Sequence, residues 1–187
     1  MDPRIARTQA AVVRAATDLL VEGGPWAVTV DAIVTRSGVA KSTIYRHWAS
    51  RDEILQSVIE RCVPHLAAPP AELGFEAALR QLAAEIVGLL NDPEWTRVLP
   101  ALLLLSAHEH GIADIEQRME DQQDDVVEDV LVRGVEEGRI RADADVRQVA
   151  ATLIGTLLMA HLTGKLPVDD ALGAHVVDVV LKVYAPS

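Results

Sequence analysis

Positive charge gathers in one short stretch of a chain that otherwise carries far more acid than base. The stretch contains four cations and a titratable histidine: Arg36, Lys41, Arg46, Arg51 and His47. No Asp or Glu lies between Arg36 and Asp52. Cations and hydrogen-bond donors in this density suit an anionic partner such as nucleic-acid phosphate.

The charge of the rest of the chain is distributed unevenly. The 187 residues carry a formal net charge of -11, which argues against a uniformly nucleic-acid-binding surface. Residues 1–61 hold 8 Lys and Arg against 7 Asp and Glu, whereas the remaining residues hold 9 against 21. Two parts of unlike charge predict two functions.

Almost every segment has the apolar period of a helix, so the sequence predicts an all-α fold. Thr29 is placed to cap a short helix that ends near Arg36, and Gly38 supplies a turn before the next helix begins near Lys41. The residues from Ser50 to Glu53 form a capping box for a fourth helix. This order predicts an N-terminal helix-turn-helix domain.

A proline-rich stretch from Pro64 to Pro70 ends the fourth helix, because proline lacks the amide donor that a helix needs. We therefore predict a boundary between a DNA-binding domain over residues 1–64 and a C-terminal helical-bundle domain over residues 65–187.

The helix from residue 41 to residue 48 separates into two faces. Ile44 and Trp48 point to the core, and the opposite face carries Lys41, Ser42, Tyr45 and Arg46. Such side chains at the start of a helix suit base edges in a major groove. At the flank, Tyr45, His47 and Arg51 are placed to contact phosphates. The plainer alternatives are a solvated basic surface, a Tyr45 that only packs and an ordinary surface histidine at position 47.

Between residues 8 and 60, the motifs "TVDAI", "GV", "STIYRHW" and "SRDEIL" resemble those of TetR-type transcriptional regulators. The resemblance implies that Lys41, Ser42 and Arg46 contact bases. It places a second group at or near phosphates: Thr29, Thr43, Tyr45, His47 and Arg51. It also implies a homodimer whose C-terminal domain binds a small molecule that releases DNA. Ala40 departs from the pattern, because the family usually has a capping Ser or Thr there.

The helix from Val146 to Thr163 is apolar nearly all round in its second half, which predicts burial on more than one side. We expect one of its faces and the last helix to pair with their copies in a dimer. The expected interface residues are Ala151, Gly155, Leu158, Leu162, Val176, Val177, Val180, Leu181 and Tyr184. The alternative is deeper burial within a monomer.

A second apolar group surrounds Pro100 and faces the later helices. The expected ligand-binding residues are Trp95, Leu99, Leu102, Leu103, Ser106, Met119, Thr156 and Met159. They have the composition of an apolar cavity with few polar anchors, and equally that of an ordinary core.

Other chemistry has little support in the sequence. Cys62 is a single cysteine. His108, Glu109 and His110 are adjacent on a predicted helix and do not face one another, so this segment alone is poorly suited to coordinate a metal. No nucleophile, base and orienting group occur at helix-compatible spacing, so we expect neither an enzyme nor a cofactor. The first ten residues do not resemble a secretion signal, and the apolar run from Ala150 to Leu162 is shorter than the ~20 residues of a membrane span.

Together these observations predict a cytoplasmic, dimeric regulator, most simply a repressor that leaves a palindromic operator when a mostly apolar effector binds. The alternative is a DNA-binding dimer with no small-molecule effector, regulated by a protein partner or by its own concentration.

Overall fold

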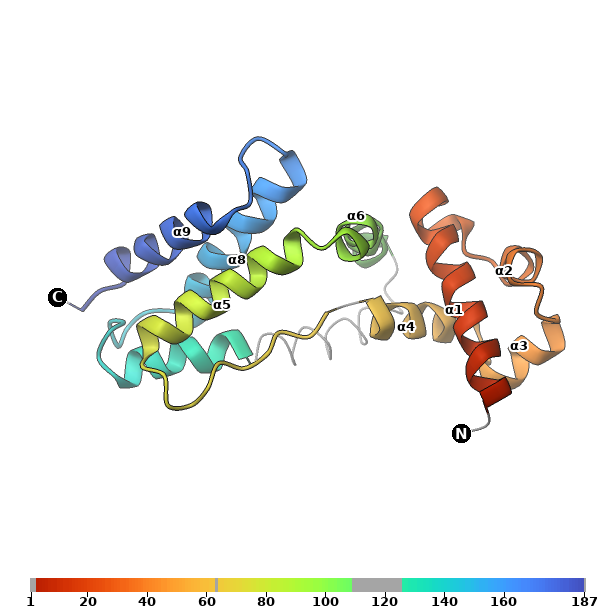
Figure 1. The fold of residues 1–187 in the computed structure, drawn as a ribbon, viewed down its shortest axis with the longest axis horizontal. Coiled ribbons are helices and arrows are strands. Elements are labelled where there is room, and N and C mark those ends of the chain that lie inside the picture. The colour runs from red at the N-terminus through yellow and green to blue at the C-terminus, as the bar shows by residue number, and fades with distance from the viewer. Residues whose placement is uncertain (1–2, 63, 109–125, 187) are drawn as a thin grey trace. The chain divides into compact units, whose positions relative to one another are not determined.

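The computed structural model describes residues 3–62, 64–108 and 126–186, and the side chains of the sixth helix are described as far as Leu105. All regular structure within these ranges is helical, as the sequence predicts. The helices form two compact units, shown in Figure 1. The first unit contains α1 (Pro3–Gly23), η1 (Pro25–Ala27), α2 (Val30–Ser37), α3 (Lys41–His47), α4 (Arg51–Cys62) and α6 (Pro93–His108). The second contains α5 (Phe75–Leu90), a helix over residues 126–136, α8 (Val146–Thr163) and α9 (Asp170–Val183).

The first unit is built around α1, which contacts α2, α4 and α6. Val12, Ala16 and Leu20 recur four residues apart and are fully buried, so they form one continuous stripe on this helix. The units do not follow the order of the chain, because α6 comes after α5 in sequence but packs against α1, α4 and η1.

In the second unit, α5, α8 and α9 lie against one another (Figure 1). Gly173 allows α9 to approach α5 closely, since a Cβ atom at this position would lie 3.1 Å from Cγ2 of Val87. Asp145 and Asp169 cap α8 and α9 by accepting backbone hydrogen bonds from Arg147 and Leu172.

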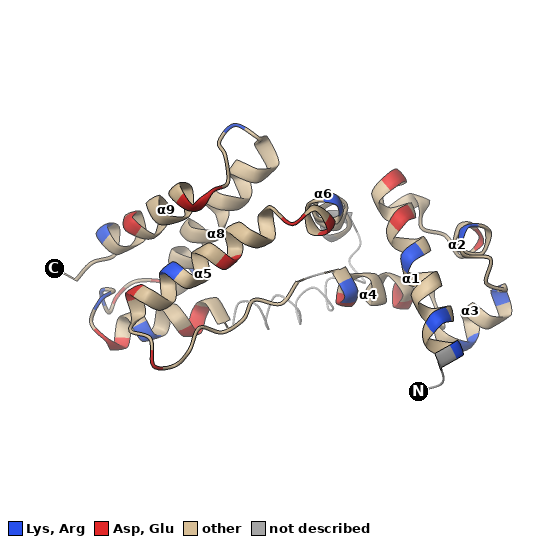
Figure 2. Cartoon of the chain, in the orientation of Figure 1, with Lys and Arg blue, Asp and Glu red and all other residues tan. Residues whose placement is uncertain are grey.

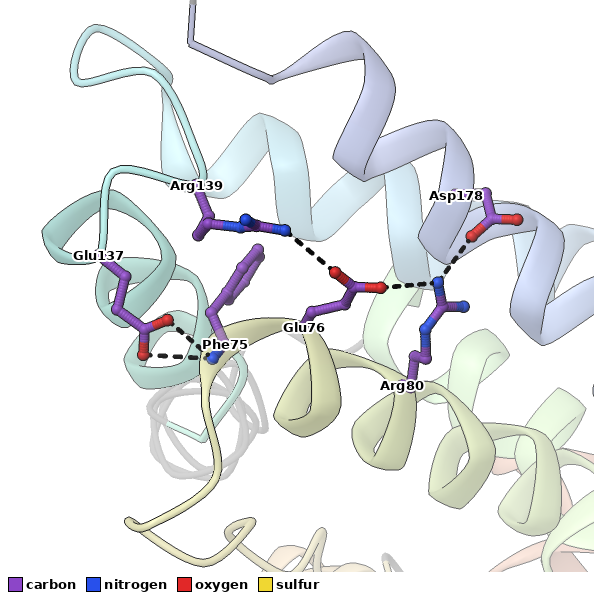
Figure 3. Close-up of polar contacts among 6 residues, drawn as sticks. All are labelled: Phe75, Glu76, Arg80, Glu137, Arg139 and Asp178. Carbon is purple, nitrogen blue, oxygen red and sulfur yellow. Dashed lines mark hydrogen bonds and ion pairs between the residues drawn. The ribbon is translucent and has the colours of Figure 1, made fainter.

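Phe75 anchors the helix over residues 126–136 to the start of α5. Its ring is fully buried, and a Cβ atom on Gly134 would lie only 2.6 Å from it, so glycine is required for this contact. The Phe75 backbone N–H donates to Oε2 of Glu137 at 3.0 Å (Figure 3). This carboxylate supplies the acceptor that the first turn of a helix otherwise lacks.

The same end of the unit carries a chain of ion pairs, also drawn in Figure 3. Glu76 binds Arg139 at 3.1 Å and Arg80 at 3.1 Å, and Arg80 continues to Asp178 on α9 at 3.0 Å. These side chains connect three segments that are far apart in sequence.

Candidate nucleic-acid interface

The turn between α2 and α3 has the geometry that the sequence predicts. Thr29 caps α2, because its Oγ1 accepts a hydrogen bond from the Ala32 backbone N–H at 3.1 Å. Gly38 ends the helix in the left-handed conformation, with φ of 69°, which favours glycine. Ala40 precedes α3 and provides no side-chain cap.

Two buried residues hold α3 against the unit and fix which face points outward. Ile44 is fully buried, and Trp48 is 6% exposed and donates from Nε1 to Oγ of Ser57 on α4 at 2.9 Å. The opposite face is exposed, and it carries Lys41, Ser42, Tyr45 and Arg46. The predicted separation of the two faces is therefore confirmed.

The other residues expected near phosphates differ in exposure. Thr43 and His47 are half-buried, and the His47 ring meets the Trp48 ring edge-on with centroids 5.8 Å apart. Thr29 is exposed at the start of α2. The hydroxyls of Thr29 and Thr43 lie on the two helices of the motif, within the first turn or cap of each.

Two basic side chains of this surface are paired with carboxylates. Lys41 Nζ lies 2.7 Å from Oδ1 of Asp31 on α2, and Arg36 Nη2 lies 2.6 Å from Oε2 of Glu22 on α1. The hydrogen bond to Asp31 raises the pKa of Lys41, and the hydrogen bond between Arg36 and Glu22 raises the pKa of Arg36 and lowers that of Glu22. Figure 2 shows this mixture of basic and acidic positions around α2 and α3.

Arg51 has structural partners that the sequence does not reveal. Its Nε donates to the Val28 carbonyl at 2.7 Å, and its Nη2 donates to the Pro25 carbonyl at 2.6 Å. The guanidinium therefore ties the start of α4 to the loop that leads into α2. The expected contact of Arg51 with phosphate remains a prediction, and these bonds direct its donors to the protein backbone.

The capping box at the start of α4 forms with one change of partner. Ser50 Oγ accepts from the Glu53 backbone N–H at 3.2 Å, as expected. The Glu53 carboxylate, however, accepts from the backbone N–H of Ala49 at 2.7 Å, one residue before the predicted donor.

Family models match both parts of the chain. Residues 12–58 match the bacterial regulatory proteins of the tetR family, and residues 69–180, more than half of the chain, match the tetracyclin repressor-like C-terminal domain. The chain belongs to the TetR family. TetR-family proteins are DNA-binding transcription regulators and are not enzymes, so the predicted class of protein is confirmed.

Individual proteins are also similar to this chain. The regulator YxbF of Bacillus subtilis is 33% identical over 100 residues, which are 50% of this chain and 26% of that protein's length. The DNA-binding transcriptional repressor TetR of Mycobacteroides abscessus is 26% identical over 178 residues, which cover 93% of this chain and 92% of that protein. Among solved structures, SmeT, the repressor of the Stenotrophomonas maltophilia efflux pump SmeDEF, has a similar fold. Its TM-score is 0.72 at 21% identity, covering 96% of this chain and 91% of SmeT.

The residues expected to bind an effector in this TetR-family chain fall in both units. On α6, Leu99 and Leu102 are buried, Trp95 is half-buried and Leu103 is 39% exposed. On α8, Thr156 and Met159 are exposed. The Ser106 side chain and Met119 lie outside the described residues. Neither unit by itself holds the whole set.

A surface cavity between α5 and α9 involves different residues. Val87, Gly173 and Val177 are among those that line it, with Arg80 and Asp170. Its volume is about 130 Å³, below the range of about 300–1,000 Å³ that is typical of ligand pockets.

The expected dimer residues divide into two groups. Ala151, Gly155 and Leu162 are exposed on α8, and Leu158, Leu181 and Tyr184 are half-buried. Val176, Val177 and Val180 are buried within the chain at 2%, 0% and 0% exposure. These three valines belong to the core of the second unit and are not available to a partner, because their face of α9 packs on α5 and α8.

Two acidic partners of these basic side chains, Glu22 and Asp31, are not identified from the sequence. Local spacing indicates only an interaction of Asp31 with the dipole of α2, and it indicates no role for Glu22. Asp31 lies ten residues before Lys41, a spacing with no meaning until the turn brings α2 and α3 together. The signal that could have identified them is the presence of acidic residues just before a segment that is rich in lysine and arginine.

Proposed function

We propose that two copies of this chain bind a palindromic operator in the bacterial cytoplasm as a transcriptional repressor. Lys41, Ser42 and Arg46 contact base edges in the major groove. A second group contacts phosphates or lies near them: Thr29, Arg36, Thr43, Tyr45, His47 and Arg51. This proposal rests on the exposed face of α3, which the buried Ile44 and Trp48 hold outward.

Dimerisation is supported by the surface of α8. This is the one helix among the described residues that is long and apolar enough to cross a membrane, with a mean hydropathy of 1.2, and only 22% of it is buried. Its exposed residues Gly155, Met159 and Leu162 form a stripe at helical spacing. A second copy of the same helix covers such a stripe with matching apolar surface, whereas the charged Arg147 and the three threonines of α8 suit a soluble assembly.

The recognition helices of the dimer enter successive major grooves, about 34–36 Å apart along the duplex. A small, mostly apolar effector releases the operator by binding more tightly to a conformation in which this spacing is lost. Support for repression comes from two similar proteins, TetR of Mycobacteroides abscessus and SmeT, which are both named repressors.

DNA binding by α3 is tested with a duplex selected from a random pool by the full-length protein. Arg46→Ala should weaken binding by about 1–3 kcal/mol, because it removes a contact to a base edge. Arg61→Ala is the matched control, since Arg61 is an exposed arginine at the end of α4. Equal binding by the two variants would contradict the assignment of α3.

One observation favours the alternative of an effector-free DNA-binding dimer. Leu99 and Leu102 are as well buried as core residues, which is how they would lie without a ligand. A thermal-shift screen with apolar small molecules separates the two proposals. A stabilising compound that also releases DNA supports the effector, and a screen without one supports regulation by concentration or by a protein partner.

A further inference from the structure

The cations of the DNA-binding surface differ in their partners. Lys41 is held by Asp31 at 2.7 Å, and Arg36 is held by Glu22 at 2.6 Å. Arg51 donates to backbone carbonyls. Arg46, by contrast, is exposed and makes no hydrogen bond or ion pair with the parts of the chain that the structure describes.

Asp31 is an acid that lies beside the first basic residue of α3. It occupies the first turn of α2, two residues after Thr29, and 81% of its side chain is exposed. Its partner Lys41 is the first residue of α3 and is 51% exposed. The carboxylate therefore lies on the surface that is proposed to face DNA, and it cancels the charge of a lysine expected at a base.

We propose that Asp31 is a specificity-determining residue, which holds Lys41 and so limits binding to DNA of unrelated sequence. This inference rests on the proposed contact of α3 with DNA. Binding without sequence preference depends on the number of phosphates that lysines and arginines neutralise. A lysine that is already neutralised adds nothing to this number until its pair is broken.

The Lys41–Asp31 pair can distinguish the operator from unrelated DNA, because Lys41 is offered a stronger contact by an operator base than by a phosphate. An exposed ion pair is weak, so a well-oriented contact of Lys41 with guanine O6 and N7 replaces it readily. At unrelated sequence, Lys41 gains only a phosphate contact, which is no stronger than the pair with Asp31 that it must break. Asp31 thereby lowers the affinity for unrelated DNA more than the affinity for the operator.

The first unit offers a control ion pair that does not involve Lys41. Asp18 on α1 pairs with Arg97 on α6 at 3.2 Å. Asp18→Asn therefore removes the same charge and the same kind of ion pair as Asp31→Asn, and it leaves the pair of Lys41 with Asp31 intact.

The experiment measures the binding of the full-length protein to two duplexes by fluorescence anisotropy, between about 50 and 200 mM salt. One duplex is selected with the wild-type protein, and the other has mixed sequence. Asp31→Asn should tighten binding to the mixed-sequence duplex about tenfold at the lowest salt, and steepen the salt dependence by about 0.9 for each further phosphate that is neutralised. The selected duplex should gain less, so the ratio of the two affinities falls. Asp18→Asn should leave this ratio unchanged.

A second pair of variants tests whether Asp31 acts through Lys41. In a Lys41→Ala background, Asp31→Asn should have only the small effect of Asp18→Asn, because no lysine remains to be freed. An equal gain in both backgrounds would overturn the inference, and so would an Asp31→Asn protein that behaves like Asp18→Asn.

Thermal stability shows whether the Lys41–Asp31 pair only stabilises the fold. Such a pair predicts a lower melting temperature for Asp31→Asn together with weaker binding to both duplexes, which also overturns the inference. The proposed function fails separately, when the wild-type protein binds neither duplex at the lowest salt.

Discussion

The first unit turns charged side chains to solvent around α3, whereas the second turns an apolar helix face to solvent along α8. Each surface is held in place by a core behind it. Ile44 and Trp48 are buried beneath α3, and the fully buried Leu153 and Leu157 lie on the inward side of α8. The two surfaces suit different partners. Positive charge attracts DNA, whereas an exposed apolar surface associates with another apolar surface.

The two units also differ in the ion pairs that they carry. In the first unit, Asp31 and Glu22 hold side chains that are expected to exchange partners when DNA binds. In the second, the Arg80–Asp178 pair joins α5 to α9. We therefore expect the pairs of Lys41 and Arg36 to exchange partners, and the pair of Arg80 with Asp178 to connect two helices.

The largest expected effect is in the core of the second unit. Phe75→Ala should lower the free energy of unfolding by about 3–5 kcal/mol, because it leaves a cavity where a fully buried ring packs on Gly134. Urea denaturation followed by circular dichroism measures the change. Val132→Ala, at a position that is 43% exposed, should stay within about 0.5 kcal/mol. Similar values for the two variants would mean that Phe75 does not anchor this unit.

Arg51 tests whether a basic residue of the first unit serves the fold or the DNA. Arg51→Met should lower the free energy of unfolding by about 1.5–3 kcal/mol, because the carbonyls of Val28 and Pro25 lose charged donors. Arg61→Met is the control at an exposed position of the same helix. Unchanged stability combined with weaker DNA binding would instead assign Arg51 to phosphate alone.

Gly155 tests the apolar surface of the second unit. A Cβ atom at this position meets nothing within the described part of the chain, so Gly155→Leu should leave the subunit folded. A larger side chain at the proposed interface should weaken self-association by about 1–3 kcal/mol through overpacking. Sedimentation equilibrium measures the change.

Gly88→Leu is the matched control for this prediction. Gly88 is also a helical glycine with open space around it among the described residues, but it lies on α5, outside the proposed interface. Equal self-association of the two variants would contradict pairing through α8.

The features that the sequence predicted are those set by neighbouring residues. The faces of α3 follow from helical period, and the Thr29 cap and the Gly38 turn follow from local backbone chemistry. The features that it missed depend on contacts between distant segments. Arg51 reaches carbonyls 23 and 26 residues earlier in the chain, and the exchange of Ser50 for Ala49 at the α4 cap depends on how the preceding turn is folded.

The last helix shows the same limit. Its apolar period correctly indicates that Val176, Val177 and Val180 are buried, but it does not indicate what buries them. These valines were expected at a dimer interface and instead pack inside one chain, because α9 lies against both α5 and α8 of its own unit. Period identifies a buried face, and only the fold identifies its partner.

The smallest expected effect concerns the missing cap of α3. Ala40 offers no side-chain acceptor, so the first amides of α3 lack the partner that Thr29 gives to α2. Ala40→Ser should therefore raise the free energy of unfolding by about 1 kcal/mol, and Thr29→Ala should lower it by about 1 kcal/mol, as measured by thermal denaturation without DNA. The two changes are opposite because one adds a cap and the other removes one. If Ala40→Ser does not stabilise the protein, the first turn of α3 already has its amides satisfied, and its uncapped end does not limit the stability of the first unit.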